Sequence, residues 1–288
     1  MRPFTYIVAR SVQEAVAALH EHGPAARILA GGTELLLEWR RPGARMPGVV
    51  IDISRIDSLR DISLEGPDML LGPITTHAEL VRSDLVRSGA PFLASASSTI
   101  GSPQVRNRGT LGGNIMNGAA CADTVPPLIA LGATVTLSSV EGDRECHLSG
   151  FYSKPFTTLA TAEELLTQVR FPVPPPGTKS AFLKLGRRNA FAITRLSVAA
   201  MVSVDGSGVI SDARIVPGAA QSVWKRAMEA ENILIGNSPS NTLFAEAGRV
   251  VTDILIKETG RRWSTEYKEP VIAALVRRTL EQCFAVND

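Results

Sequence analysis

The chain has 288 residues, and its 30 Lys and Arg against 28 Asp and Glu give a formal net charge of +2. Hydrophobic residues make up 44% and charged residues 20%, which excludes a largely disordered chain and supplies material for a sizeable core. The near-neutral balance argues against a nucleic-acid-binding protein, which needs a basic surface. The length suggests one large domain or two to three smaller ones.

The cysteines and the apolar runs narrow the class of protein further. Cys121, Cys146 and Cys283 are far apart and form no CxxC pair, so we expect neither a metal site held by this chain nor a disulfide framework. Sparse cysteines fit a reducing compartment. No apolar signal core follows the first residues, and no stretch approaches the ~18 apolar residues of a membrane helix. We therefore expect a soluble cytoplasmic protein without a membrane span.

The first part of the chain predicts helices and strands separated by glycine turns. Ser11 is a good N-cap and Glu14 stands three residues later, which makes a capping box for a first helix. An apolar run at 26–30 predicts a strand that ends in glycines, and a helical pattern follows at 34–39. Further apolar patterns predict strands at 49–53 and 69–71 and helices at 76–86 and 92–100.

The segment 101–122 is rich in glycine and asparagine and shows little helical or strand periodicity. A loop of that length inside a compact domain is usually functional or disordered. The segments on both sides of it show clear helix or strand periodicity, and Leu111, Ile115 and Met116 within it are apolar residues that can pack into a core. We therefore expect an ordered, functional loop.

The last part of the chain predicts an α+β module behind a proline-rich linker. A short helix at 128–133 and strands at 134–137 and 165–171 precede the linker at 172–177, whose prolines exclude regular structure. Runs at 197–204 and 209–216 flank Asp205-Gly206, a strong hairpin turn. Three amphipathic helices are expected to follow, at 223–235, 243–257 and 269–284. We expect domains at 1–175, with lobes at roughly 1–55 and 56–175, and at 176–288.

Two glycine pairs are candidates for a phosphate site. Gly31 and Gly32 stand between a strand and a helix, where backbone N–H groups can approach an anion, and Thr33 can cap the helix or bind a phosphate oxygen. A plain tight turn explains this loop equally well. Gly112 and Gly113 repeat the pattern about eighty residues later, with Arg106 and Arg108 just upstream. An irregular glycine-rich connection is the plainer interpretation of the second loop, but both loops follow well-formed elements. Together, the two loops suggest a ligand with two phosphates held from both sides.

Two polar residues, Asp123 and Lys184, have a functional and a plainer interpretation. Asp123 can accept hydrogen bonds from sugar or ribityl hydroxyls, or it can cap a short helix. Lys184 can stabilise negative charge on a reduced cofactor, although a solvated surface lysine is the commoner case. His77 is expected at the surface. No histidine stands at metal-ligand spacing, and we find no Ser-His-Asp arrangement.

The motifs AGGTEL at 30–35 and TIGSPQVRNRGTLGGNI at 99–115, taken together, resemble the FAD-binding subunit of molybdenum hydroxylases, the xanthine dehydrogenase and carbon monoxide dehydrogenase family. The resemblance covers almost the whole chain and includes Phe4-Thr5-Tyr6 and Ala122-Asp123-Thr124. It implies an α+β fold: a bilobed FAD-binding domain of the vanillyl-alcohol oxidase (PCMH) type and a smaller C-terminal α+β domain.

The resemblance also implies which residues contact FAD. The first loop would wrap the pyrophosphate, the second would bind pyrophosphate and ribityl, and Ile100 would lie over the isoalloxazine ring. The residues that match family positions near the cofactor are Ile28, Leu29, Ala30, Gly31, Gly32, Thr33, Glu34, Leu35, Ile100, Thr110, Leu111, Gly112, Gly113, Asn114, Asp123, Leu165, Leu166 and Lys184. No catalytic side chain and no metal ligand is implied in this chain.

The activity that the resemblance implies is electron transfer within a complex. Molybdopterin would lie on a large subunit and [2Fe–2S] clusters on a small subunit, and FAD on this chain would pass electrons to an acceptor, which we expect to be NAD⁺. Many family members carry an acidic residue in the stretch that is here Asn189-Ala190-Phe191-Ala192-Ile193, so another acceptor stays possible.

Two other functions remain open. One is a self-contained flavin oxidase or reductase of the same fold, for which Cys121, near the second loop, would be the candidate for covalent flavin attachment. The other is an assembly protein that has lost FAD, against which the intact glycine pairs argue. The substrate of the complex stays open among purines, N-heterocycles, aldehydes, aromatic thioesters and carbon monoxide, and so does the stoichiometry, for which the family suggests a dimer of heterotrimers.

Overall fold

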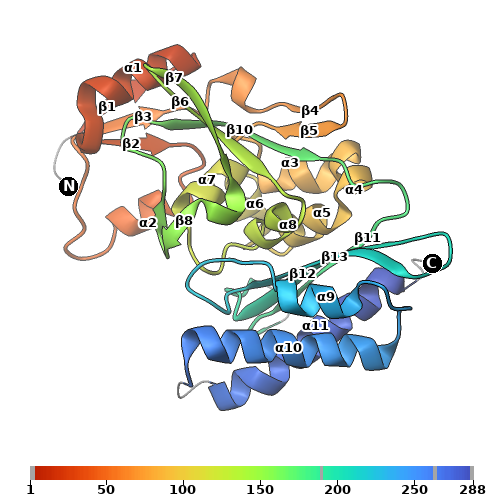
Figure 1. Ribbon diagram of the computed structural model, residues 1–288. Coiled ribbons are helices and arrows are strands. Elements are labelled where there is room, and N and C mark those ends of the chain that lie inside the picture. Colours follow the sequence, from red (N-terminus) through yellow and green to blue (C-terminus); the bar gives the residue numbers. More distant parts are fainter. Residues whose placement is uncertain (1–3, 189–190, 262–264, 286–288) are drawn as a thin grey trace.

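The computed structural model describes residues 4–188, 191–261 and 265–285. The N-terminal part builds a small parallel sheet in the order β1-β3-β2. Its elements are β1 (Thr5–Val8), α1 (Val12–His22), β2 (Ala26–Leu29), α2 (Leu35–Trp39) and β3 (Val49–Asp52). The central strand β3 is buried, and its Val49 and Ile51 pack in one cluster with apolar residues of α1. Figure 1 shows this sheet beside α1 at one end of the molecule.

The first helix begins where the sequence predicts. The Ser11 side chain accepts a hydrogen bond from the backbone N–H of Glu14 at 3.1 Å, so Ser11 caps α1. In a full capping box the Glu14 carboxylate would accept from the N–H of Ser11, but here it accepts from the N–H of Arg10. The predicted N-cap is therefore confirmed, whereas the second hydrogen bond of the box goes to the preceding residue. α1 buries Ala15, Val16 and Leu19 against β3 and the neighbouring sheet.

A five-stranded antiparallel sheet follows, in the order β4-β5-β10-β6-β7. Its strands are β4 (Ile62–Glu65), β5 (Asp68–Leu71), β6 (Thr134–Ser139), β7 (Gly142–His147) and β10 (Leu165–Pro172). The edge strand β7 carries charged, exposed residues, which protect an open sheet edge from pairing with other chains. A short hairpin of β8 (Tyr152–Lys154) and β9 (Thr157–Thr158) lies between β7 and β10 in the chain.

Short helices cover one side of this sheet and differ from the prediction in two places. They are α3 (His77–Arg82), α4 (Asp84–Gly89), α5 (Pro91–Ser98), α6 (Pro103–Arg106), α7 (Leu111–Asn117) and α8 (Val125–Ala130). The helix predicted at 76–86 breaks because Ser83 is extended and caps a new helix by accepting from the N–H of Val86. The segment 101–122 is ordered as predicted, but it contains α6 and α7 instead of being a loop throughout.

The C-terminal part is a three-stranded antiparallel sheet covered by three helices. Its elements are β11 (Lys179–Leu185), β12 (Leu196–Val204), β13 (Ile210–Gly218), α9 (Met228–Leu234), α10 (Asn241–Thr259) and α11 (Thr265–Phe284). The hairpin predicted around Asp205-Gly206 is confirmed, with β12 paired to β13. The helix predicted from residue 223 begins only at Met228, because Val223 and Trp224 pack into the core from an irregular segment.

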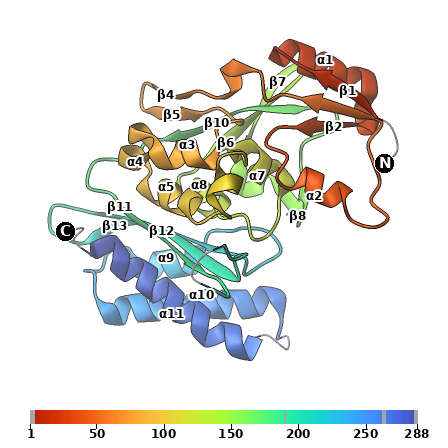
Figure 2. The same cartoon turned by 180° about the vertical axis from the view of Figure 1, so that it is seen from behind.

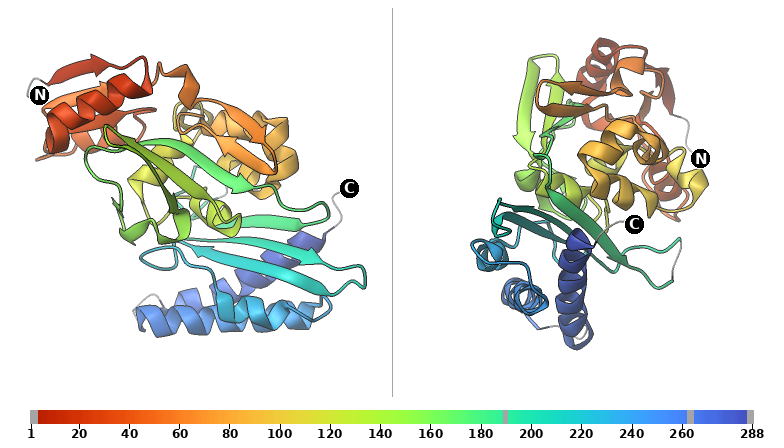
Figure 3. Two further views of the ribbon diagram at one scale, coloured as in Figure 1. Left: turned by 45° about the horizontal axis from the view of Figure 1, so that its top comes forward. Right: turned by 90° about the vertical axis from the view of Figure 1, so that its right-hand side faces the viewer.

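The two faces of this C-terminal sheet enter different cores. One face packs under α9–α11, while Phe182, Ala199, Met201 and Val216 join the cluster that fills the space around α5, α7 and α8. Figure 3 shows the resulting layers, with the C-terminal sheet between the two groups of helices, and Figure 2 shows them from behind. The central strand β12 is buried from Leu196 to Val202 because apolar layers cover both of its faces. One hydrophobic core therefore continues across the proline-rich linker.

The shared core makes the first 175 residues dependent on the rest of the chain. A fragment of residues 1–175 is expected to aggregate and to bind a hydrophobic dye, because removal of Phe182, Met201 and Trp224 exposes the cluster that these residues cover. Co-expression with a fragment of residues 176–288 should restore a soluble pair. A fragment 1–175 that is monomeric and unfolds cooperatively by itself would contradict this expectation.

Candidate cofactor site

The two glycine pairs, about eighty residues apart in the chain, lie against each other. A Cβ atom on Gly31 would stand 1.9 Å from the carbonyl oxygen of Arg108 and 3.1 Å from Cα of Gly109. The backbone of the second loop thus passes directly over the first loop, at a distance that no residue with a side chain allows. Glycine at position 31 is required by this contact within the protein itself.

The first loop presents unused hydrogen-bond donors. Gly32 has φ of +72°, a conformation that favours glycine and turns the chain from β2 into α2. Within the described part of the chain, the backbone N–H groups of residues 31–35 meet no hydrogen-bond acceptor. Thr33 does not cap α2, since the N-cap residue is Glu34 and no side-chain bond closes that end. A run of free N–H groups in a glycine turn is suited to an anion.

The second loop is arranged differently, because its N–H groups are already bonded. Leu111 donates to the carbonyl of Thr75, Gly112 to the carbonyl of Pro73, and Gly113 to the side chain of Thr110, at 2.9, 2.7 and 3.1 Å. Thr110 therefore caps α7, a helix that was not predicted from the sequence. Leu111 is fully buried, and the Asn114 side chain accepts from Thr124 at 2.7 Å.

Glycine at positions 112 and 113 has two different environments. A Cβ on Gly112 would meet Pro73 at 2.5 Å, so this glycine is needed for packing inside the protein. Gly113 is exposed, and a Cβ there would be close only to the hydroxyl of Thr110, at 2.9 Å. Gly113 is thus the glycine of the second loop whose only close neighbour is a side-chain hydroxyl, that of Thr110, which caps α7.

Two cations hold the turn that carries Ile100, which follows α5. Lys184 Nζ donates to the carbonyl of Thr99 at 3.1 Å, and Arg106 Nη1 donates to the carbonyls of Ile100 and Gly101 at 3.0 and 3.1 Å. Arg106 is therefore occupied within the protein, while the side chain of Arg108 is exposed and forms no ion pair with the described residues. Of the two arginines singled out in the sequence, Arg108 is the one available to a ligand.

Asp123 and Lys184 form a buried ion pair beside this turn. Lys184 Nζ lies 2.6 Å from Oδ2 of Asp123, and Thr194 Oγ1 donates to Oδ1 of Asp123 at 2.5 Å. Burial raises the pKa of Asp123, and Lys184 and Thr194 counteract that rise. The solvated surface position considered for Lys184 is wrong, since only 11% of its side chain is exposed. Thr194 was not among the predicted residues, because nothing in its sequence neighbours indicates a partner in the other half of the chain.

The predicted apolar pair at positions 165 and 166 faces two cores. Leu165 packs with the N-terminal sheet and α1, and Leu166 joins the larger cluster with α5 and α7, because neighbouring residues of a strand point to opposite faces. Both are 3% exposed. The structure accounts for both as core residues, and their contact with FAD stays a prediction, as do the contacts of Ile28, Leu29, Ala30 and Leu35 in and around β2.

His77 is buried, which corrects the expectation of a surface position. Its side chain is 2% exposed, its backbone N–H donates to the carbonyl of Gly109, and Nδ1 has no partner among the described residues. Burial, and then the charge of Arg106, lower the pKa of His77 to about 4. The neutral ring supports the second loop, and the sequence offered no sign of it because the contact is to a residue 32 positions away.

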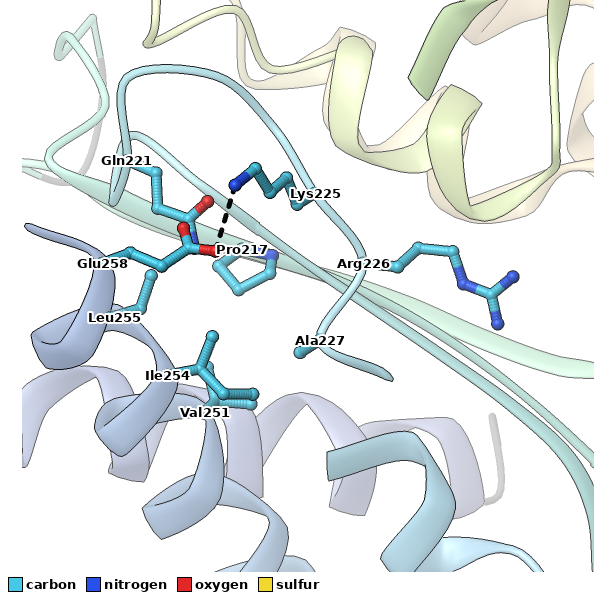
Figure 4. Close-up of a pocket in the computed structure, with 9 residues that line it drawn as sticks. All are labelled: Pro217, Gln221, Lys225, Arg226, Ala227, Val251, Ile254, Leu255 and Glu258. Carbon is cyan, nitrogen blue, oxygen red and sulfur yellow. Dashed lines mark hydrogen bonds and ion pairs between the residues drawn. The ribbon is translucent and has the colours of Figure 1, made fainter. Parts of the chain in front are cut away.

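A small pocket elsewhere in the molecule is lined from β13, the segment after it and α10 (Figure 4). Lys225 and Glu258 pair across it at 3.0 Å, so its charges are satisfied within the chain. It contains none of the predicted site residues. Over residues 4–188, 191–261 and 265–285, no cluster of His, Cys, Asp and Glu could hold a metal ion, and no helix is long and apolar enough to cross a membrane.

Comparison with known proteins places this chain in one family. The family described as the FAD binding domain in molybdopterin dehydrogenase matches residues 2–174, and the CO dehydrogenase flavoprotein C-terminal domain matches residues 181–283. The chain is 35% identical to the 6-hydroxypseudooxynicotine dehydrogenase complex subunit alpha of Paenarthrobacter nicotinovorans, over 97% of this chain and 95% of that protein. It is 32% identical to the glyceraldehyde dehydrogenase medium chain of Sulfolobus acidocaldarius, over 97% and 98%.

The fold is that of a solved relative over nearly its whole length. A chain of the carbon monoxide dehydrogenase from Hydrogenophaga pseudoflava superimposes with a TM-score of 0.91 at 32% identity, and the match covers 99% of each chain. The expected order of an FAD-binding domain and a smaller α+β domain is confirmed. The chain belongs to the molybdopterin dehydrogenase flavoproteins, the family of the carbon monoxide and xanthine dehydrogenases, as the FAD-binding medium subunit of an oxidoreductase complex.

Proposed function

We propose that this chain holds FAD between the two glycine loops and transfers electrons from [2Fe–2S] clusters of a small partner subunit to an acceptor, NAD⁺. The observation that carries the proposal is the run of free backbone N–H groups at residues 31–35, beside the exposed Arg108 and the open face of Gly113. Free N–H groups and a guanidinium that pairs with no carboxylate among the described residues suit the two phosphates of FAD.

The residues of this chain have separate tasks in that proposal. Residues 31–35 would donate to the pyrophosphate, and Gly113 would leave room for it. The turn at Ile100 would cover the ring, with Lys184 beneath. Bound FAD would supply the redox chemistry, which links single-electron transfer from the clusters to two-electron transfer to the acceptor. The chain's contribution is binding, orientation and the exclusion of competing reactions, so no side chain needs to act as an acid or base.

The partners follow from the chemistry that this chain lacks in its described residues. We propose a molybdopterin-binding large subunit, where substrate is oxidised, and a [2Fe–2S] small subunit. The names of the relatives include 6-hydroxypseudooxynicotine, glyceraldehyde and carbon monoxide, so similarity does not select the substrate. Cys121, Cys146 and Cys283 form no disulfide, which fits the proposed cytoplasmic location.

The test is the visible spectrum of the natively purified complex, with acid release of the flavin and identification of the co-purifying chains. The expected result is free FAD, a molybdopterin-binding chain and an iron–sulfur chain. Flavin that stays attached to denatured protein at Cys121, or a yellow chain that is isolated alone and reduced directly by a small substrate, would make this a self-contained flavin enzyme. An isolated complex without flavin would favour an assembly protein.

The acceptor is tested on the same preparation. With the complex reduced by its substrate, NAD⁺ is expected to reoxidise the flavin faster than dissolved oxygen does, as followed by the recovery of flavin absorbance. Reoxidation by oxygen or by an artificial dye, with no response to NAD⁺, would overturn that part of the proposal.

FAD added to the flavin-free chain at a thousandfold excess over its Kd should raise the free energy of unfolding by about 4 kcal/mol.

A further inference from the structure

Thr194 lies on the C-terminal side of the linker and bonds to a residue on the other side. It precedes β12 and is 6% exposed, and its hydroxyl donates to Oδ1 of Asp123 at 2.5 Å. Asp123 is 4% exposed and belongs to the match of the FAD-binding domain, whereas Thr194 belongs to the match of the C-terminal domain. The bond therefore joins two parts of the chain that the proline-rich linker separates.

The other oxygen of the Asp123 carboxylate also accepts a hydrogen bond from the C-terminal side of the linker. Oδ2 of Asp123 accepts from Lys184 Nζ at 2.6 Å, and Lys184 Nζ also donates to the carbonyl of Thr99 at 3.1 Å. Thr99 begins the turn that carries Ile100. A continuous path of hydrogen bonds thus runs from Thr194 through Asp123 and Lys184 to this turn.

The turn itself is held at three consecutive carbonyl groups. Lys184 binds the carbonyl of Thr99, and Arg106 binds the carbonyls of Ile100 and Gly101. Arg106 is the last residue of α6, the short helix that follows the turn, and fixes the turn locally. Lys184 comes from β11, so the position of Thr99 relative to the glycine loops depends on the C-terminal sheet.

We infer that Thr194 is a positioning residue, which orients Asp123 and Lys184 so that the C-terminal domain holds the Thr99–Gly101 turn in the shape that binds FAD. The inference rests on the proposed FAD site. Without the hydroxyl, Oδ1 of Asp123 loses the hydrogen bond from Thr194, and the carboxylate can rotate away from Lys184. Lys184 then no longer fixes the carbonyl of Thr99.

The test compares Thr194→Val and Thr194→Ser in the full chain, from which FAD has been removed. Thr194→Val is expected to weaken FAD binding by about tenfold, as measured by the change in flavin fluorescence on titration. It should also change the circular dichroism of bound flavin between 350 and 500 nm. Thr194→Ser keeps the hydroxyl and should restore both properties to within about twofold. These readouts follow the geometry of the bound ring, which a general loss of stability does not change.

Thr279→Val is the matched control. Thr279 is fully buried in α11, and its hydroxyl donates to the carbonyl of Leu275 at 2.7 Å, away from Asp123. This variant loses the same group in a similarly buried place and should bind FAD like the wild type. Equal loss of FAD affinity in Thr279→Val and Thr194→Val would overturn the inference.

Hydrogen exchange on the unmodified chain tests the same path without any variant. FAD binding is expected to slow exchange in peptides that cover residues 99–106 and also in those that cover residues 191–200. Protection of 99–106 with no change at 191–200 would overturn the inference even if Thr194→Val failed to fold. A wild-type chain that binds no FAD would refute the proposed function, whereas unchanged FAD affinity in Thr194→Val would refute only the role of Thr194.

Discussion

Replacement of Gly31 by alanine is expected to abolish FAD binding and to lower the free energy of unfolding of the FAD-free chain by about 3 kcal/mol or more. The added Cβ would lie 1.9 Å from the carbonyl oxygen of Arg108. That oxygen belongs to the backbone, so no change of rotamer relieves the overlap and the two loops must separate. Urea unfolding of the FAD-free chain, together with a titration by flavin fluorescence, measures both effects.

Gly113→Ala distinguishes an effect on FAD binding from an effect on the stability of the fold. Gly113 is exposed within α7, and its added Cβ would be close only to the side chain of Thr110. The Thr110 hydroxyl, which caps α7, must shift to admit this Cβ, and the loss of Gly in a helix offsets part of that cost, so the free energy of unfolding without FAD should change by no more than about 1 kcal/mol. FAD binding should weaken at least about tenfold, because the methyl group occupies space predicted for the cofactor.

Gly206→Ala is the control for both glycine variants. Residue 206 lies in the β12–β13 turn, and a Cβ there meets nothing within 4 Å, so both stability and FAD affinity should stay unchanged. Wild-type stability of Gly31→Ala would show that the two loops do not touch in solution. Full FAD affinity of Gly113→Ala would remove the second loop from the predicted cofactor contacts.

The second large expected effect is a fall in the free energy of unfolding at acid pH, and its cause is the buried His77. Burial holds the pKa of His77 at about 4, whereas an unfolded histidine has a pKa near 6.5. The unfolded chain therefore binds a proton at this residue before the folded chain does. The stability contribution is fully present above pH 6.5 and declines as the pH falls to 4, by about 3 kcal/mol in total.

His77→Leu tests this origin of the pH dependence. Leucine has a similar size, and the unpartnered Nδ1 means that no side-chain hydrogen bond at that atom is lost. The free energy of unfolding of the variant, measured by urea titration between pH 4 and 7, should depend less steeply on pH than that of the wild type. His147→Gln, at an exposed histidine, should keep the wild-type slope. Parallel pH profiles of His77→Leu and wild type would show that His77 does not stay neutral in the folded chain.

Several elements of the fold were predictable from residues that are close together in the chain. Ser11 caps α1, Asp205-Gly206 turns the β12–β13 hairpin, and the glycine pair with Gly32 forms the turn between a strand and a helix. The helix α7 could also have been predicted, because Thr is a common N-cap residue and Gly a common residue at a helix C-terminus, and Thr110 and Gly118 stand at these places. The many glycines of the segment concealed that pattern.

The sequence indicated which residues belong to the candidate site, but it did not indicate which other residues they contact. Glycines at 31 and 113 have different surroundings: the backbone of Arg108 excludes a side chain at 31, whereas only the Thr110 hydroxyl is close at 113. His77 was expected at the surface because a single histidine near a helix start carries no sign of burial. The partnership of Thr194 with Asp123 joins residues 71 positions apart, which no local pattern encodes.

Capping, turn formation and apolar periodicity depend on atoms a few residues apart, so the amino-acid order alone was sufficient for the α+β class, most elements and the two glycine turns. The meeting of the loops, the burial of His77 and the ion pair of Lys184 arise where separate sheets and helices pack. Such contacts depend on how the N-terminal sheet, the helical layer and the C-terminal sheet share one core, and that packing exists only in the folded chain.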